Sequence, residues 1–173
     1  MDATASPADA ATLMAALARS AGGPPRAYLA AARTTLSKLL ARADLLDRVV
    51  LDRRPGGFTR NLLFGQGRMS VWAIVWSPGA TTPVHDHHCS CCFGVLGGRV
   101  RETWYRAISD THAVAVGEAV RAPGHIACMM PSGPNLHRMT NDGPFEAVSL
   151  HVYGYDHEVH ATSIERTYRV AAG

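Results

Sequence analysis

The sequence predicts a mainly β protein in which a small antiparallel barrel or sandwich follows an N-terminal helical extension. Residues 1–55 carry alanine and leucine at helical spacing, whereas the chain beyond residue 55 is divided into short runs rich in Val, Ile, Thr, Phe, Tyr and Trp. Of the 173 residues, 47% are hydrophobic and 18% are charged, which is enough apolar material for one core and too little charge for disorder. We expect a single domain over 1–173, with a helical extension at 1–55 and a barrel at 56–173.

Two helices are expected in the extension. The first begins at Ser6-Pro7, because serine is a good N-cap and proline fits the first helical position, and it ends at Gly22-Gly23. The second runs from about residue 25 to residue 42, where apolar residues recur every three or four positions. A short turn is expected over 44–50. These helices are interpreted as a pad against a sheet, without chemistry of their own.

Ten strands are expected after residue 55, each ended by Gly, Pro, Asn or Asp. Gly97-Gly98 predicts a hairpin turn between two of them, and the arginine-rich segment 99–106 is interpreted as a solvated strand face. Short antiparallel strands at this spacing are typical of small barrels, which hold a ligand in their mouth. The expected strands are 58–65, 68–77, 82–86, 90–96, 99–107, 112–116, 126–130, 135–140, 145–153 and 162–169.

Charge and hydropathy argue against two classes of partner. The net charge is only +3 and the basic residues are scattered, so no nucleic-acid partner is expected. No apolar stretch is long enough to span a bilayer, and the chain begins Met1-Asp2 without a basic segment typical of a signal peptide. We therefore expect no membrane partner and a cytoplasmic protein.

The cysteines support the same compartment. Three of the four, Cys89, Cys91 and Cys92, lie within four positions, whereas a disulfide framework would spread them along the chain. We expect reduced thiols, with Cys128 as a small buried hydrophobic residue. The three clustered cysteines beside histidines could also form a zinc site, but Cys91 and Cys92 point apart on a strand, which disfavours this alternative.

A possible metal site follows the strand-like run 69–76 and its Pro/Gly-rich turn. His85 and His87 are two positions apart, so on a strand they share one face and can bind one metal ion. His137 is the best candidate for a third ligand. The remaining histidines lack such context and are interpreted as structural or solvated, namely His88, His112, His125, His157 and His160.

The spacing of these histidines resembles the two motifs of the cupins. In the first motif the position of Cys91 usually holds a glutamate ligand, so three neutral imidazoles remain here and a divalent ion keeps its full charge. That charge favours capture of an anionic thiolate, and the vacant coordination positions are typical of a catalytic metal. The matching residues are Gly79-x5-His85-x-His87-x3-Cys91-x6-Gly98, and Pro131-Ser132-Gly133 followed by His137-x3-Asn141.

Over roughly residues 58–155 the chain is similar to the cysteine dioxygenase family of thiol dioxygenases. The similar blocks are Phe58-Thr59-Arg60-Asn61-Leu62, His85-Asp86-His87 through Phe93 and 98–103, and 136–141 with 147–153. This resemblance implies a cupin fold, a small antiparallel β-barrel or jelly roll. It also implies a non-haem Fe(II) cofactor bound by His85, His87 and His137.

The resemblance further implies a catalytic row and a substrate anchor. Ser149, His151 and Tyr153 would form a relay whose phenol points at the substrate and dioxygen, and their spacing of two puts them on one strand face. Arg60 would hold the substrate carboxylate, a task that suits a planar guanidinium with parallel donors. Phe58, also beside the substrate, stands where animal members carry tyrosine, so one polar contact is expected to be absent.

Animal members of the family also cross-link a cysteine to the relay tyrosine through a thioether. Cys91 fits this role by its distance to Gly98, and Cys92 fits it by its distance from His87 and by the Phe that follows. Either one is therefore a candidate for a cross-link to Tyr153.

The expected function is a thiol dioxygenase that adds both atoms of O2 to the sulfur of a small thiol, with L-cysteine as the expected substrate because Arg60 is present. Relatives that use 3-mercaptopropionate carry Gln near this position, whereas mercaptosuccinate users also have Arg, so these thiols remain alternatives. A non-catalytic metal-binding cupin is the alternative from another class, and the row on 149–153 argues against it. The expected partners are a small thiol and O2, and the expected assembly is a monomer or small homo-oligomer.

Overall fold

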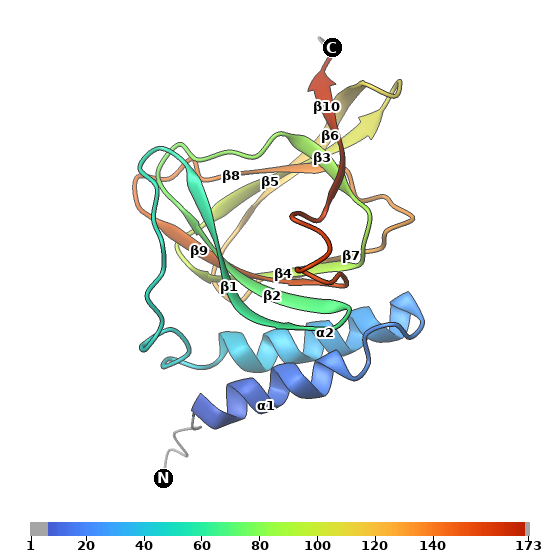
Figure 1. The fold of residues 1–173 in the computed structure, drawn as a ribbon. Coiled ribbons are helices and arrows are strands. Elements are labelled where there is room, and N and C mark those ends of the chain that lie inside the picture. The colour runs from blue at the N-terminus through green and yellow to red at the C-terminus, as the bar shows by residue number, and fades with distance from the viewer. Residues whose placement is uncertain (1–6, 172–173) are drawn as a thin grey trace.

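Two helices and ten strands make up residues 7–171, the part of the chain that the computed structural model describes (Figure 1). The helices are α1 (Pro7–Ala18) and α2 (Pro25–Leu40). Ser6, the expected N-cap of α1, lies outside the described residues. The strands are β1 (Phe58–Gln66), β2 (Met69–Trp76), β3 (Val84–His87), β4 (Cys91–Gly97), β5 (Val100–Ala107), β6 (His112–Arg121), β7 (Ile126–Met129), β8 (His137–Thr140), β9 (Ala147–Tyr153) and β10 (Ile164–Val170).

The strands form two sheets, which confirms the mainly β prediction. One sheet has five strands in the order β1-β2-β9-β4-β7, and the other closes on itself in the order β10-β3-β8-β5-β6. Most neighbours are antiparallel, and β10 alone pairs in parallel, with β6. Helix α2 lies against the outer face of the five-stranded sheet and α1 packs beside it (Figure 1). The two expected helices thus form the predicted pad.

Side chains along the strands of the five-stranded sheet alternate between its two faces, and each face has its own hydrophobic core. On β2, Met69, Val71 and Ala73 face the helices and join a cluster that includes Leu36 and Leu39 of α2. The intervening Ile74 and Trp76 face the barrel interior instead and belong to a second cluster. Because successive side chains on a strand point to opposite faces, one apolar strand serves both layers.

Two glycines mark close approaches around β4. A Cβ on Gly94 would lie 2.6 Å from Leu40 Cδ1, so the absence of a side chain lets α2 settle onto the sheet. Gly98 has φ +68°, and a Cβ there would lie 2.6 Å from the carbonyl oxygen of Glu146. The expected hairpin at Gly97-Gly98 is wrong, because β4 pairs with β7 and β9 whereas β5 pairs with β6 and β8. The two glycines make a corner between the sheets.

The expectation of four reduced cysteines is also wrong. Cys92 on β4 and Cys128 on β7 are cross-strand partners and form a disulfide, while Cys89 and Cys91 are free and buried. This disulfide could not be predicted from the sequence, because 36 positions separate the two cysteines and only the β4–β7 register brings them together. Across residues 7–171 the cysteines contribute to no three-ligand metal cluster.

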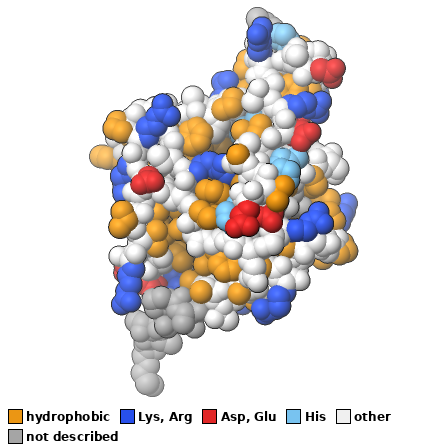
Figure 2. Space-filling model, viewed as in Figure 1, with side chains coloured by type: hydrophobic (Ala, Val, Ile, Leu, Met, Phe, Trp, Pro, Cys, Tyr) orange, Lys and Arg blue, Asp and Glu red, His pale blue; other side chains and the backbone are white. Residues whose placement is uncertain are grey.

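The surface carries no concentrated charge on the face that Figure 2 shows, where the described lysines and arginines are dispersed among apolar and uncharged groups. None of the helices in the described chain has the length and apolarity needed to span a membrane.

Candidate active site

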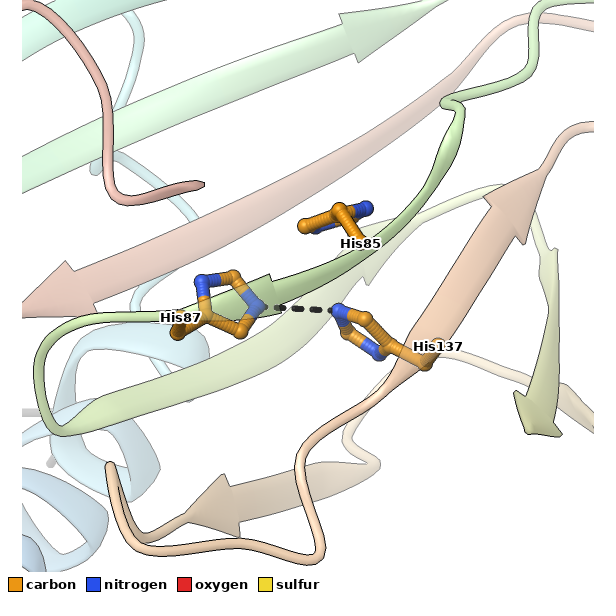
Figure 3. A group of neighbouring side chains, drawn as sticks. All are labelled: His85, His87 and His137. Atoms are coloured by element: carbon orange, nitrogen blue, oxygen red, sulfur yellow. Dashed lines mark hydrogen bonds between the residues drawn. The ribbon is translucent and has the colours of Figure 1, made fainter. Parts of the chain in front are cut away.

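Three histidines from two distant segments meet inside the barrel (Figure 3). His85 and His87 come from β3, and His137 comes from β8, where it is the direct cross-strand partner of His85. One ligand nitrogen from each ring lies within 4.8 Å of the others, and the Nε2 atoms of His87 and His137 are 3.1 Å apart. Among residues 7–171 this is the one group of three His, Cys, Asp or Glu side chains placed to share an ion.

The protein fixes the second ring nitrogen of these histidines. His85 Nδ1 lies 2.9 Å from the carbonyl oxygen of Pro83, and His137 Nδ1 lies 3.0 Å from Oε1 of Glu102. A carbonyl or an ionised carboxylate oxygen can only accept, so both Nδ1 atoms carry the hydrogen. The Nε2 lone pairs of the two rings are therefore free for a metal ion.

Burial keeps the rings of His85 and His87 uncharged. Burial, followed by the neighbouring His137, lowers the pKa of His85 to about 4 and that of His87 to about 2. A hydrogen bond between His87 Nδ1 and the hydroxyl of Ser163, 3.1 Å away, opposes this shift only in part. At neutral pH these two rings thus retain the lone pairs that metal binding requires.

A row of polar side chains runs along β9 beside the histidines. Ser149, His151 and Tyr153 all face the barrel interior and are buried. Ser149 Oγ lies 2.8 Å from His151 Nε2, and His151 Nδ1 lies 3.1 Å from Tyr153 Oη. Trp76 extends the row, because its indole N–H donates to Ser149 Oγ at 2.9 Å, and the Phe93 ring stacks on His151. The structure therefore brings the three predicted relay residues into one hydrogen-bonded chain.

The direction of the hydrogen bonds in this row depends on the tautomer of His151. Since the indole of Trp76 fills one lone pair of Ser149 Oγ, the serine hydroxyl can donate its own hydrogen to His151 Nε2. In the tautomer with the His151 hydrogen on Nδ1, that nitrogen donates to Tyr153 Oη, and the phenol hydrogen is not used by His151. Burial lowers the pKa of His151 to about 3 and raises that of Tyr153 well above its ordinary value, so both groups are neutral at neutral pH.

Arg60 on β1 is held from three sides. Its guanidinium lies 4.3 Å from the ring centroid of Trp72, donates through Nη1 to the carbonyl of Ala161 at 2.8 Å, and donates through Nη2 to Tyr155 Oη at 2.6 Å. None of the ion pairs formed within residues 7–171 involves Arg60. A guanidinium has about five N–H donors, so this fixed cation retains some for an anionic ligand.

One small cavity of about 50 Å³ joins these groups. The three histidines, Arg60, Tyr153 and Cys91 line it, and Phe58 contributes to an apolar wall with its ring 5.2 Å from that of Trp76. Larger cavities of about 410 and 440 Å³ lie elsewhere and contact none of the three histidines. We choose the small cavity as the candidate site because the donors for metal and anion converge on it, and its size suits a small ligand.

The two candidate cross-link cysteines lie on opposite faces of β4. Cys91 is the direct cross-strand neighbour of Tyr153, and its free thiol lines the same cavity. Cys92 pairs with Val152, faces the helices and is bonded to Cys128. Cys92 as the partner of Tyr153 is therefore wrong, and Cys91 alone has a suitable position.

Several residues of the site escaped the sequence analysis. Glu102 lies inside the arginine-rich segment interpreted as solvated, yet it is 1% exposed and contacts His137. Alternation with the buried Val100 was the signal that could have revealed it. Ser163 and Tyr155 come from the irregular segment between β9 and β10, for which strand periodicity makes no prediction. All five histidines interpreted as structural or solvated lie outside the three-histidine cluster.

The chain matches the model of the family described as cysteine dioxygenase type I over residues 48–161. The chain belongs to the cysteine dioxygenase family. The match starts before β1 and ends beyond Tyr153, so it includes the histidine cluster, the β9 row and Arg60. The family and the three-histidine cluster together fit a metal-dependent oxygenase of the cysteine dioxygenase type with a small thiol and O2 as substrates.

Solved structures show the same fold. An uncharacterised conserved protein with a double-stranded β-helix domain from Klebsiella pneumoniae is 20% identical, with a TM-score of 0.50, over 64% of this chain and 87% of that one. A protein assigned as a sugar phosphate isomerase from Acidithiobacillus ferrooxidans is 24% identical, with a TM-score of 0.50, over 67% of this chain and 74% of that one. These likenesses establish the cupin fold and nothing about the reaction.

The donor set of the cysteine dioxygenase-like site fits a metal cofactor. Imidazole nitrogens suit Fe, Zn, Cu and Ni, and the cluster contains neither carboxylate nor thiolate. Typical metal–nitrogen bonds of about 2.1 Å place two ligand atoms roughly 3.0 to 3.4 Å apart, close to the 3.1 Å between the Nε2 atoms of His87 and His137. Three neutral ligands leave the full charge of a divalent ion available to anionic substrates.

Proposed function

We propose that the chain is a non-haem Fe(II) thiol dioxygenase that converts L-cysteine to cysteine sulfinate. The observation that carries the proposal is that three separate arrangements end in one small cavity: the histidine cluster, the β9 row and the clamped Arg60. A protein that only binds metal has no use for an oriented phenol and for a fixed guanidinium that forms no ion pair within residues 7–171. Mercaptosuccinate and 3-mercaptopropionate are the alternative substrates.

The chain would bind the substrate at two points. His85, His87 and His137 would hold Fe(II) through neutral nitrogens, which would leave the charge of the ion available to a thiolate. The guanidinium of Arg60 accepts the carboxylate through its remaining N–H groups. When bound, Fe(II) supplies the redox chemistry that transfers both atoms of O2 to the thiolate, which gives a sulfinate and requires no external reductant. The two anchors fix which atom of the substrate meets the metal.

Tyr153 would act as a hydrogen-bond donor to the oxygen being transferred. With the hydrogen of His151 on Nδ1, the row from Trp76 through Ser149 and His151 would leave the phenol hydrogen available for the substrate side, and the raised pKa keeps the phenol protonated. A donor fixed before the reaction stabilises developing charge without having to reorganise. Phe58 supplies apolar surface and no hydrogen bond. A thioether between Cys91 and Tyr153 stays a prediction, as do a cytoplasmic location and a monomeric or small homo-oligomeric state.

The test is oxygen uptake by protein loaded anaerobically with Fe(II). L-cysteine, mercaptosuccinate, 3-mercaptopropionate and cysteamine are supplied in turn, and the product is weighed by mass spectrometry after reaction under labelled O2. We expect cysteine to give a sulfinate with two labelled oxygens. Faster uptake with another thiol acid would change the substrate, and uptake with none of the thiols would favour a non-catalytic metal-binding cupin.

A further inference from the structure

Glu102 connects the histidine cluster to the opposite side of the barrel. It lies on β5, its side chain is 1% exposed, and Oε1 accepts a hydrogen bond from His137 Nδ1 at 3.0 Å. A buried carboxylate is costly unless hydrogen bonds and an opposite charge compensate it. Glu102 lies directly behind one of the three converging imidazoles, so some other group must compensate its buried charge.

Arg121 on β6 provides the compensating charge. Its Nε and Nη2 both donate to Oε2 of Glu102, at 2.9 and 2.8 Å. Oε2 therefore binds Arg121, whereas Oε1 binds His137. The guanidinium lies 4.9 Å from the ring centroid of Trp104, which limits its freedom, and its side chain is 16% exposed at a cavity of about 410 Å³. Arg121 thus fixes the direction in which the other oxygen of Glu102 faces.

The three rings of the cluster differ in what holds their Nδ1 atoms. His85 has a backbone carbonyl, His87 has the hydroxyl of Ser163, and His137 alone has a carboxylate. A charged acceptor forms the strongest of these hydrogen bonds and draws most electron density toward the opposite nitrogen. His137 should therefore be the strongest donor of the three.

We propose that Glu102, oriented by Arg121, is a positioning residue that fixes the Nδ1–H tautomer and ring direction of His137 and strengthens its bond to the metal. The cluster contains no carboxylate ligand, so Glu102 brings carboxylate charge to the site through an imidazole. Arg121 neutralises that charge nearby, so the ion still attracts thiolate and carboxylate groups. This inference rests on the proposed metal centre.

The first experiment compares Fe(II) affinity in anaerobic competition with a chelator. Glu102→Gln removes the charge at nearly constant volume, and we expect binding to weaken about 10–100-fold, the usual effect of losing such a partner. Glu118→Gln is the matched control, since Glu118 lies on the neighbouring strand and pairs only with Arg101 at the surface. A folded Glu102→Gln protein with wild-type affinity would overturn the proposal. Arg121→Gln should weaken binding less, and no change would overturn the part assigned to Arg121.

The second experiment reads the tautomer of His137 directly, by nitrogen NMR of histidine-labelled protein prepared without metal. Wild type should show His137 with its hydrogen on Nδ1, and Glu102→Gln should show a mixture. A merely structural role would lower stability but leave the tautomer unchanged. Wild-type His137 with its hydrogen on Nε2 would overturn the proposal even if the variant fails to fold. Absence of Fe(II) binding by wild type would instead refute the proposed function.

Discussion

Strand β9 presents Leu150 to the helices and Ser149 to the barrel interior, one position apart and both 0% exposed. The helix side of the sheet is an ordinary apolar core, where shape and volume decide stability. The interior side also has an apolar cluster, but it adds imidazoles and hydroxyls that are buried and joined by hydrogen bonds. The contrast teaches that burial alone does not distinguish a core from a site, whereas the pairing of buried polar groups does.

The largest loss of activity should come from substitution of a metal ligand on the interior face. His137→Ala removes the only ligand from β8, so Fe(II) content and thiol-dependent oxygen uptake should both fall to background. Metal analysis and oxygen electrode traces measure the two quantities. His112→Ala is the control, because His112 lies on β6, outside the three-histidine cluster, and its ring hydrogen-bonds the hydroxyl of Thr111. Wild-type uptake by His137→Ala would remove this residue from the ligand set.

A change on the helix face should have the opposite signature. Leu150→Ala creates a cavity in the apolar core and should lower the free energy of unfolding by about 2–5 kcal/mol. Fe(II) bound per folded molecule should remain at the wild-type level, since Leu150 points away from the cluster. Denaturant titration and metal analysis test the two statements. If metal binding fell in step with stability, the two faces would not be independent.

Acid should destabilise the metal-free protein through the buried histidines of the interior face. The pKa values of His85, His87 and His151 are lowered to about 4, 2 and 3, so below about pH 6.5 the unfolded chain binds protons that the folded chain does not. The contribution of these neutral rings to the free energy of unfolding is therefore fully present above about pH 6.5. It is lost as the pH falls, by up to about 1.4 kcal/mol per pH unit for each ring. Denaturant titrations between pH 7 and pH 5 measure the slope. A flat profile would mean that these rings are accessible to solvent.

A smaller change should separate substrate binding from turnover. Tyr155→Phe removes one of the contacts that hold Arg60, so the KM for carboxylated thiols should rise about tenfold with little change in kcat, as expected for the loss of roughly one hydrogen bond to a charged group. Cysteamine, which lacks the carboxylate, should show no change. Tyr105→Phe serves as the control, since Tyr105 is buried in a separate cluster. An equal effect on both thiols would indicate that Tyr155 does not act through Arg60.

The sequence predicted the elements of both faces better than the connections between them. All ten expected strands occur, because β-branched and aromatic runs ended by turn residues are local signals. Strand β6 continues to Arg121, well beyond the expected end at residue 116, because its ladder with β5 extends past Gly117. The Cys92–Cys128 bond and the corner at Gly98 depend on which strands pair, and no local pattern records that.

The site shows the same division. The histidines and the β9 row were predictable because spacings of two on a strand fix a common face. The contacts that hold them were not, since Trp76 reaches Ser149 across 73 positions and Glu102 reaches His137 across 35. Arg60 was predictable by family resemblance, whereas its clamp by Tyr155 and Ala161 arises from an irregular segment.

The most direct test of the account is X-ray absorption at the iron edge of anaerobically loaded protein, recorded before and after L-cysteine is added. Three imidazoles on one ion with vacant positions predict nitrogen and oxygen neighbours alone in the first spectrum and one new sulfur neighbour in the second. Sulfur scattering before any thiol is present would mean that a protein cysteine binds the iron. A spectrum that cysteine leaves unchanged would contradict a site built to receive a thiolate.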